Sequence, residues 1–190
     1  MMLNFEDFEE KTISRKEIFN GKIIDVALDD VKLPNGQTSK RELVFHAGGV
    51  GIIAITPENK MVFVRQFRKP LEKVLLEIPA GKIDPGENDH PEITGKRELE
   101  EETGYTCDFM THIASMYLSP GFSNEMMHIY LANEIKKAAH PKSQDEDELI
   151  ELYELTLEEA EQAVKDQTIC DAKTVYAITW WKLLVAQGSV

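Results

Sequence analysis

The amino-acid sequence predicts an α/β fold, in which mixed sheets and helices form an α/β/α sandwich preceded by an antiparallel β meander. Segments typical of strands recur along most of the chain, separated by Gly, Pro and Asn turn signals. Helical patterns appear after residue 90 and again near the C-terminus. The chain has 190 residues. This length suits one domain with a sizeable core and an appendage of about forty residues.

The N-terminal segment, residues 1–47, is expected to form a β appendage that is separate from a main domain at residues 48–190. A shift to a more apolar composition after Gly48 marks this boundary. Asn-Gly dipeptides supply the positive φ angles that tight hairpins require. The predicted strands of the appendage are residues 14–19, 22–33 and 39–46, with turns at Asn20-Gly21 and Pro34-Asn35-Gly36.

The main domain carries further strand patterns and two helices near its C-terminal end. Thr156 and Glu159 form the sequence signature of a capping box, which opens a helix that runs to about Lys165. Asp171 can cap the second helix, and we interpret Trp181 as a packing group on its apolar side. The predicted strands are residues 50–56, 61–66, 74–77, 106–118, 125–133 and 149–155.

Another helix follows a Gly/Pro-rich loop in the middle of the chain. Pro91 suits its first position, where the missing N–H costs nothing, and Gly104 suits the left-handed position that ends a helix. Gly95 inside this helix costs about 1 kcal/mol relative to Ala. We therefore expect a close packing contact at Gly95.

This helix gathers negative charge on one face. Glu98, Glu101 and Glu102 are spaced i, i+3 and i+4, so their carboxylates project from the same side. Like charges at this spacing oppose the helix, whereas a divalent cation would turn the repulsion into coordination, because Mg²⁺ and Mn²⁺ prefer carboxylate oxygens. For an arbitrary glutamate run the simpler interpretation is a solvated acidic face.

The surrounding pattern favours the metal site. It consists of Gly81, Glu87 and the run Arg97-Glu98-Leu99-x-Glu101-Glu102-x-Gly104-Tyr105. This pattern resembles the Nudix box, the signature of the pyrophosphate-hydrolysing Nudix hydrolase superfamily, and it has many fixed positions. It departs from the usual box at one point, because nine residues rather than seven separate Glu87 from Arg97. We expect the two extra residues to lengthen an exposed loop before the helix, which leaves the role of Glu87 open.

The resemblance implies a Nudix-type fold and a set of site residues. It assigns the metal ligands as Glu98, Glu101, Glu102 and the backbone carbonyl of Ala80, which together bind two or three Mg²⁺ or Mn²⁺ ions. Glu102 is also placed among the catalytic residues. Arg97 resembles the box arginine that orients the carboxylates, with Glu77 or Glu87 as its expected partner.

A second acidic cluster precedes the last predicted strand, at Asp145-Glu146-Asp147-Glu148. Taken alone, it is typical of a charged loop. Beside a metal site, a carboxylate from this loop could accept the proton of the attacking water. Related ADP-sugar hydrolases have their catalytic base in this loop, so the resemblance implies Glu146 or Glu148, and the choice between them stays open.

The substrate prediction depends on a narrower resemblance, to the ADP-ribose pyrophosphatase subfamily. Pro120 stands sixteen residues after Gly104, as the proline marker of that subfamily does. Arg65 and Arg68 lie at a predicted strand end, where they could hold diphosphate oxygens or could be ordinary edge-strand charges. The predicted reaction is hydrolysis of ADP-ribose to AMP and ribose 5-phosphate. The subfamily also implies a homodimer to which the N-terminal strands contribute.

Composition limits the other classes of function. The formal charge of −13 argues against a nucleic-acid partner, because phosphate backbones need a basic surface. No apolar run approaches 18 residues and the N-terminus does not resemble a signal peptide, so no membrane partner and a cytoplasmic location are expected. Cys107 and Cys170 are expected to be buried thiols.

Two alternatives to ADP-ribose hydrolysis stay open. One is hydrolysis of another nucleoside diphosphate sugar, such as GDP-mannose, on the same metal scaffold. The other is a non-catalytic Nudix-like module that binds a nucleotide and regulates a partner. Modules of the second kind tend to lose box carboxylates, whereas this chain retains Glu98, Glu101 and Glu102.

Overall fold

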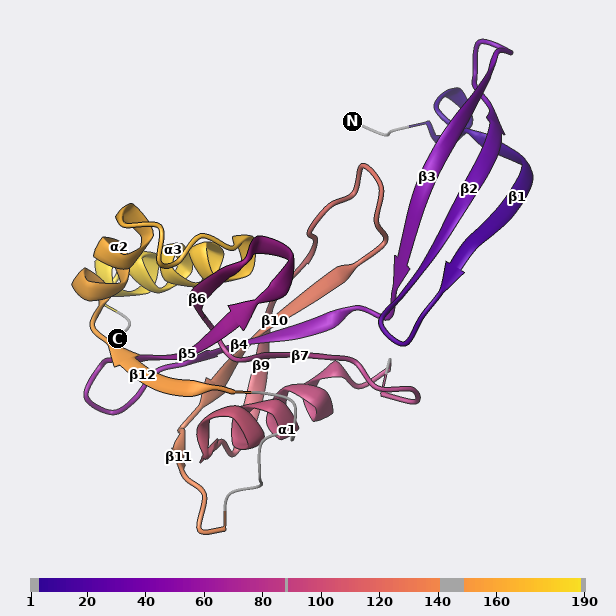
Figure 1. Cartoon of the computed structure of the whole chain (residues 1–190). Helices are drawn as coiled ribbons and strands as arrows, with labels where there is room; N and C mark the ends of the chain where they lie inside the picture. Colours follow the sequence, from indigo (N-terminus) through magenta and orange to yellow (C-terminus); the bar gives the residue numbers. More distant parts are fainter. Residues whose placement is uncertain (1–3, 88, 141–148, 189–190) are drawn as a thin grey trace. The chain divides into compact units, whose positions relative to one another are not determined.

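The computed structural model describes residues 4–87, 89–140 and 149–188 (Figure 1). The chain divides into two compact units. The first unit comprises residues 1–48 with residues 117–126, and the second comprises residues 49–116 with residues 127–190. The α/β fold predicted from the sequence is confirmed, since strands and helices are both present in the described chain.

The first unit is built on a three-stranded antiparallel sheet in the order β1-β2-β3. A short 3₁₀ helix, Phe5–Asp7, precedes the sheet. Within the sheet, Asp29 is only 1% exposed. Its carboxylate accepts two hydrogen bonds of 2.8 Å from Arg15 and one of 3.1 Å from the Thr12 hydroxyl. The strands are β1 (Lys11–Asn20), β2 (Ile24–Lys32) and β3 (Thr38–His46).

The two turns of this sheet differ in what they require of glycine. Gly36 has φ +83°, as the Asn-Gly pattern predicts. Gly21 is not among the glycines with positive φ, so the same prediction is wrong there. A Cβ at Gly21 would instead overlap the ring of Phe19 and reach the carbonyl oxygen of Ile24 at 3.0 Å. The turn therefore needs glycine for space rather than for a left-handed backbone.

The described residues of the second unit form three small sheets. The largest has the order β7-β4-β10-β9, in which β4 and β10 run parallel with Gly49 opposite Met127. A three-stranded sheet has the order β12-β5-β6, and β11 pairs with β8. The strands are β4 (Gly49–Ala54), β5 (Met61–Arg68), β6 (Lys73–Glu77), β7 (Ala80–Lys82), β8 (Tyr105–Thr106), β9 (Phe109–Tyr117), β10 (Met126–Asn133), β11 (Lys136–Lys137) and β12 (Glu151–Leu155).

Helices lie on opposite sides of the strands in this unit. Helix α1 (Pro91–Thr103) lies on one side, and α2 (Leu157–Lys165) and α3 (Ala172–Ala186) lie on the other (Figure 1). Every residue of β4 is buried. Leu99 of α1 and Val50 of β4 belong to the same fully buried core cluster. This layering is the sandwich that the sequence predicts, with α1 fixed on the core by its apolar face.

Both predicted caps of the C-terminal helices are confirmed. Thr156 and Glu159 form both halves of the capping box at α2. The Asp171 side chain caps α3 by accepting a 3.1 Å hydrogen bond from the backbone N–H of Thr174. Trp181 is fully buried, as expected of a packing group. Within the described ranges, none of the helices combines the length and apolar character needed to cross a membrane.

Two further sequence predictions need correction. The single strand expected at residues 106–118 is two strands, β8 and β9, because Cys107 and Asp108 separate them. Cys107 is buried as expected, but Cys170 is exposed. Cys170 immediately precedes the Asp171 cap, so it lies in the turn before α3 rather than on the apolar side of a helix. The expectation that both thiols are buried is therefore wrong.

The prediction of a close contact at Gly95 is confirmed, and it has a measurable consequence. A Cβ at Gly95 would lie 2.8 Å from Met110 Sδ and 3.1 Å from Val50 Cγ1. We expect Gly95→Val to lower the free energy of unfolding by about 1–3 kcal/mol through overpacking. Urea denaturation would measure it. Gly121→Val is the matched control, since no atom lies within 4 Å of its added Cβ. Equal stability of the two variants would contradict the packing argument.

Candidate active site

Helix α1 begins and ends as the sequence predicts. Pro91 occupies the first turn, and Gly104 ends the helix with φ +67° and donates its N–H to the Glu100 carbonyl over 2.9 Å. The helix buries Leu99 and turns the glutamates away from that core contact. Its position beside β7 brings the glutamates to the loop that precedes the helix in the sequence.

Glu98 lies directly against the backbone of β7. A Cβ built at Gly81 would overlap the Cγ, Cδ and Oε1 atoms of Glu98. Any side chain at position 81 would therefore force the Glu98 carboxylate to move, because that carboxylate occupies the volume that the side chain would fill. This contact explains in physical terms why glycine follows Ala80 in the motif.

Arg97 offsets the repulsion between two of the glutamates. Its Nη1 donates to Glu98 Oε1 at 2.8 Å and to Glu101 Oε2 at 3.0 Å, while Nη2 lies 3.0 Å from Asp84 Oδ2. Burial alone would lower the pKa of Arg97, but the surrounding Glu98, Glu101 and Asp84 carboxylates raise it above its usual value. One guanidinium thus holds carboxylates from the helix and from the loop together.

Of the two partners predicted for Arg97, Glu77 and Glu87, only Glu87 lies near it. Glu87 lies 3.8 Å from Arg97 Nη2, and it also accepts a 2.5 Å hydrogen bond from the Thr94 hydroxyl. The longer loop therefore still leaves Glu87 beside the helix. Glu77 pairs with other cations instead, so its assignment to Arg97 is wrong. Asp84, which the sequence analysis did not select, makes the closer contact with Arg97.

Glu102 connects the helix to the backbone at Ala80. It is only 5% exposed, and its Oε2 accepts a 3.0 Å hydrogen bond from the Ala80 N–H. A hydrogen bond to a charged group is worth about 1.5–3 kcal/mol, so this contact fixes the start of β7 against α1. The two predicted ligands Ala80 and Glu102 are thus neighbours in the structure.

The two arginines proposed for substrate have different surroundings. Arg68 makes a bidentate contact with buried Glu77, Nε to Oε1 at 2.6 Å and Nη2 to Oε2 at 2.8 Å. Arg65 pairs with Glu151 on the neighbouring strand β12 and lies 5.0 Å from the ring centroid of Tyr153. The edge-strand interpretation therefore describes Arg65 well, whereas Arg68 is held by a buried acid near the candidate ligands.

Pro120, Glu146 and Glu148 are the remaining residues predicted from the sequence. Pro120 belongs to the first unit, in a turn closed by hydrogen bonds from the Phe122 and Ser123 N–H groups to the Ser119 carbonyl at 3.1 and 2.9 Å. Its role in substrate binding stays a prediction. Glu146 and Glu148 lie outside the described residues.

The donor set suits a hard divalent cation. Carboxylate oxygens of Glu98, Glu101 and Glu102 share one side of α1, and the space left by Gly81 lets Glu98 approach the backbone. Within residues 4–87, 89–140 and 149–188, no three His, Cys, Asp or Glu side chains already converge as a cation site. Arg97 supplies the positive charge between Glu98 and Glu101 in this arrangement.

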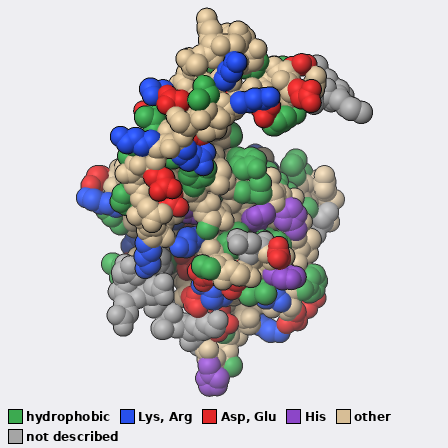
Figure 2. All heavy atoms as spheres, turned by 90° about the vertical axis from the view of Figure 1, so that its right-hand side faces the viewer, with side chains coloured by type: hydrophobic (Ala, Val, Ile, Leu, Met, Phe, Trp, Pro, Cys, Tyr) green, Lys and Arg blue, Asp and Glu red, His purple; other side chains and the backbone are tan. Residues whose placement is uncertain are grey.

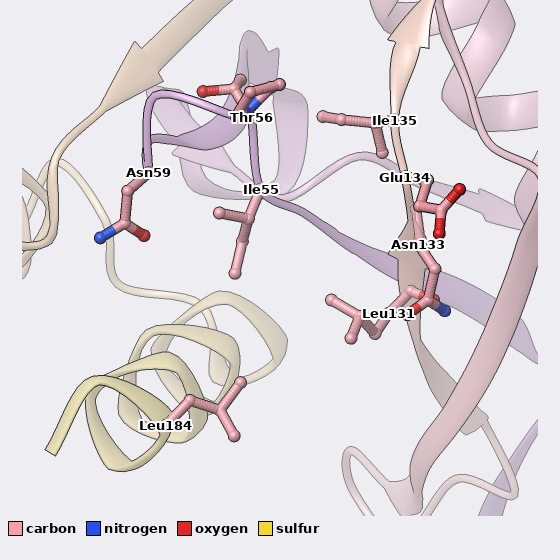
Figure 3. Close-up of a pocket in the computed structure, with 10 residues that line it drawn as sticks. Ile55, Thr56, Asn59, Leu131, Asn133, Glu134, Ile135 and Leu184 are labelled. Atoms are coloured by element: carbon pink, nitrogen blue, oxygen red, sulfur yellow. The ribbon is translucent and has the colours of Figure 1, made fainter. Parts of the chain in front are cut away.

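A cavity of about 390 Å³ lies apart from these residues, at the carboxyl ends of the parallel strands β4 and β10. Ile55, Leu131 and Leu184 point toward it, whereas the carboxylate of Glu134 points away (Figure 3). None of the predicted site residues that the structure describes lines this cavity. The cavity is therefore separate from the carboxylates of Glu98, Glu101 and Glu102.

Charge is mixed on the surface. On the face that Figure 2 shows, acidic and basic side chains are interspersed. The chain as a whole carries a formal charge of −13. An anion that approaches α1 therefore depends on cations placed locally, such as Arg68, or on bound metal ions.

The fold and the carboxylate-bearing helix define a protein of the Nudix class, and comparison with known families agrees. The model of the NUDIX domain matches residues 45–176, and the model of the nucleoside diphosphate sugar hydrolase N-terminal domain matches residues 10–44. The chain belongs to the NUDIX family, so the resemblance stated from the sequence is confirmed. Nudix hydrolases generally use divalent metal ions.

Individual relatives cover nearly the whole chain. The chain is 53% identical to the methanol dehydrogenase activator of Bacillus methanolicus over 176 residues, which cover 93% of this chain and 94% of that protein. It is 50% identical to the ADP-ribose pyrophosphatase of Bacillus subtilis (strain 168) over 178 residues, which cover 94% and 95% of the two chains. A crystal structure of an ADP compounds hydrolase has the same fold, with a TM-score of 0.81, 21% identity, and coverage of 96% and 97%.

The contact between Gly81 and Glu98 can be tested by adding one methyl group. In Gly81→Ala the new Cβ displaces the Glu98 carboxylate, so we expect binding of Mn²⁺ to weaken at least about tenfold, as loss of one ligand would. Titration followed by electron paramagnetic resonance would measure the affinity. Glu98→Ala is the comparison and should have a similar effect. Unchanged Mn²⁺ affinity in Glu98→Ala would show that Glu98 is not a ligand, and unchanged affinity in Gly81→Ala alone would show that the contact at Gly81 does not fix it.

Proposed function

We propose that the protein hydrolyses the diphosphate of ADP-ribose to AMP and ribose 5-phosphate with bound Mg²⁺ or Mn²⁺. The observation that carries the proposal is that Glu98 and Glu102 contact the Ala80–Gly81 backbone while Arg97 joins Glu98 to Glu101. It is supported by the 50% identity to an ADP-ribose pyrophosphatase over 94% of the chain.

Each of the site residues has a separate role in the proposed reaction. Glu98, Glu101, Glu102 and the Ala80 carbonyl would hold two or three divalent cations, and Glu102 belongs to the catalytic set. The bound cations would supply charge stabilisation of phosphate oxygens and a water of lowered pKa. Arg97 orients Glu98 and Glu101 by its hydrogen bonds. A carboxylate at Glu146 or Glu148 would accept the proton of the attacking water.

Arg68 is the better of the two arginines for holding the substrate. Glu77 accepts hydrogen bonds from its Nε and Nη2. A guanidinium held in this way can direct its remaining donors at a diphosphate oxygen. Pro120 and Arg65 complete the proposed set of substrate residues, with Arg65 the weaker of the arginines because it pairs with Glu151.

Another nucleoside diphosphate sugar is the enzymatic alternative. The match of residues 10–44 to the nucleoside diphosphate sugar hydrolase N-terminal domain supports this broader substrate class. Turnover of ADP-ribose, GDP-mannose and other nucleoside diphosphate sugars with Mg²⁺ would separate the two. Turnover of GDP-mannose without turnover of ADP-ribose would replace the leading proposal.

The role of the carboxylates is tested by charge removal at constant size. Glu101→Gln and Glu102→Gln should lower kcat by about two orders of magnitude or more, since each removes a metal ligand. Glu102→Gln retains an oxygen that can accept from the Ala80 N–H, so its fold should stay intact. Glu100→Gln is the matched control, with the same charge change on the same helix. Equal kcat in all three variants would overturn the metal assignment.

A second candidate function is regulation of a partner enzyme. The 53% identity to a protein named methanol dehydrogenase activator favours it. The two functions differ in what they require of the carboxylates, because regulation by nucleotide binding alone needs no hydrolysis. Activation of a dehydrogenase that is retained in Glu102→Gln would separate regulation from hydrolysis.

We also propose that the protein is a homodimer, with β1 in the interface. This strand is at the edge of its sheet and all ten of its residues are exposed. Ile13 and Ile18 lie at the two register irregularities of the β1–β2 pair and are 58% and 54% exposed. An edge strand with exposed apolar side chains is a surface suited to another chain.

The dimer proposal predicts a change in mass. Ile18→Glu should convert a dimer into a monomer in sedimentation velocity, because a charge cannot be buried without a partner. Leu183→Glu, a similar change at an exposed position on α3, should leave the dimer unchanged. A monomeric unsubstituted protein, or a dimeric Ile18→Glu variant, would contradict this interface.

A further inference from the structure

Lys173 occupies an unfavourable position for a cation. It is the second residue of α3 after the Asp171 cap, and it is only 7% exposed. The N-terminus of a helix carries partial positive charge, so a lysine there is opposed by both the helix dipole and burial. Such a residue persists only where local partners compensate it.

The compensation comes from two acids. Lys173 Nζ donates to Glu77 Oε2 and, over 2.9 Å, to Asp171 Oδ2. Glu77 Oε2 also accepts from Arg68 Nη2 at 2.8 Å, so Arg68 and Lys173 share one carboxylate oxygen. Glu77 is 2% exposed. Burial alone would raise the pKa of Glu77, but the hydrogen bond from Arg68 and the charge of Lys173 bring it below its usual value.

This network is attached to the loop that carries the candidate ligands. Glu77 is the last residue of β6, three positions before Ala80. The N–H of Ile78, the next residue, donates to the hydroxyl of Thr174 at 3.0 Å. The N–H of Ala80 then donates to Glu102 at 3.0 Å. The first turn of α3 therefore contacts both the side chain and the backbone of the segment that leads into the site.

Among Arg68, Lys173 and Glu77, Arg68 is the most exposed, so an approaching anion can reach it. Its side chain is 38% exposed, compared with 9% for Lys173 and 2% for Glu77. The hydrogen bond to Glu77 raises the pKa of Arg68, and the charges of Glu102 and Asp171 act in the same direction. Arg68 is thus within electrostatic reach of a candidate metal ligand while buried charges hold its other edge.

We propose that Lys173 is a positioning residue for substrate, which balances Glu77 so that Arg68 is held ready to bind the diphosphate group. The inference rests on the proposed function and extends it to a residue of the C-terminal helix. With Lys173 present, the two cations and the two acids Glu77 and Asp171 cancel in formal charge. Without Lys173, one uncompensated negative charge lies beside the bound anion, and Arg68 is drawn further toward Glu77.

The test is the substitution Lys173→Met, which retains a long apolar side chain. We expect KM for ADP-ribose to rise at least about tenfold while kcat changes by less than about threefold, since Lys173 does not touch the reacting atoms. The affinity of Lys173→Met for inorganic pyrophosphate, measured by calorimetric titration without metal, should fall by a similar factor. Lys173→Arg, which retains the charge, should recover part of both losses.

Lys182→Met is the matched control. It removes a lysine from the same helix and changes the net charge equally, but Lys182 is exposed and pairs with Glu161 on α2. It should bind pyrophosphate and turn over ADP-ribose as the unsubstituted protein does. Equal pyrophosphate affinity in folded Lys173→Met and Lys182→Met would overturn the proposal.

A measurement on Arg68 itself separates this proposal from the proposed function. The Nε–H resonance of Arg68, assigned by its loss in Arg68→Lys, should shift and exchange faster with water in Lys173→Met. An unchanged resonance would overturn the positioning role, whatever the substrate. If the unsubstituted protein fails to hydrolyse ADP-ribose, the proposed substrate is wrong, but the resonance and pyrophosphate binding still decide the role of Lys173.

The charge balance can also be tested if Lys173→Met does not fold. In Glu77→Gln/Lys173→Met the buried charges are removed together, so we expect folding to be recovered, because an unpaired buried acid is no longer present. Arg68 then lacks its anionic anchor, and pyrophosphate should still bind at least about tenfold more weakly. Full pyrophosphate affinity in this folded double variant would contradict the role of both residues.

Discussion

The concentration of negative charge at one face of α1 is the constraint that the rest of the site must satisfy. Glu98, Glu101 and Glu102 lie within two turns, and like charges at this spacing oppose the helix. The structure offsets them with different partners. Arg97 bridges Glu98 and Glu101, and the Ala80 N–H supports Glu102.

The same constraint explains the glycines around the helix. Gly81 provides the volume that the Glu98 carboxylate occupies, and Gly95 lets the opposite side of α1 approach Val50 and Met110. The cost of Gly95 to helix propensity is therefore offset by packing on the core. Close approach on both sides fixes how far the carboxylates project from the sheet, which a longer side chain at either glycine would change.

The sequence predicted the parts of this arrangement that depend on local spacing. The i, i+3, i+4 spacing placed three carboxylates together, Pro91 and Gly104 bounded the helix, and Asp171 capped α3. It failed where the partner is distant or the turn is unusual. Glu77 and Lys173 are 96 residues apart, and no local pattern pairs them. A lysine in the first turn of a capped helix was the available signal, because that position is unfavourable for a cation.

The pairing of the acidic residues before α1 with cations also differs from the sequence prediction. Glu77 and Glu87 were both expected as possible partners for Arg97. Burial decides between them. Glu77, at the end of β6, is almost fully buried and already accepts hydrogen bonds from Arg68 and Lys173. Arg97 is left to Asp84 and the helix glutamates. Two separate ion networks result, one that orders the helix carboxylates and one that orders Arg68. Among the described residues, the backbone from Glu77 to Asp84 connects the two networks, so a change in either network reaches the other through that loop.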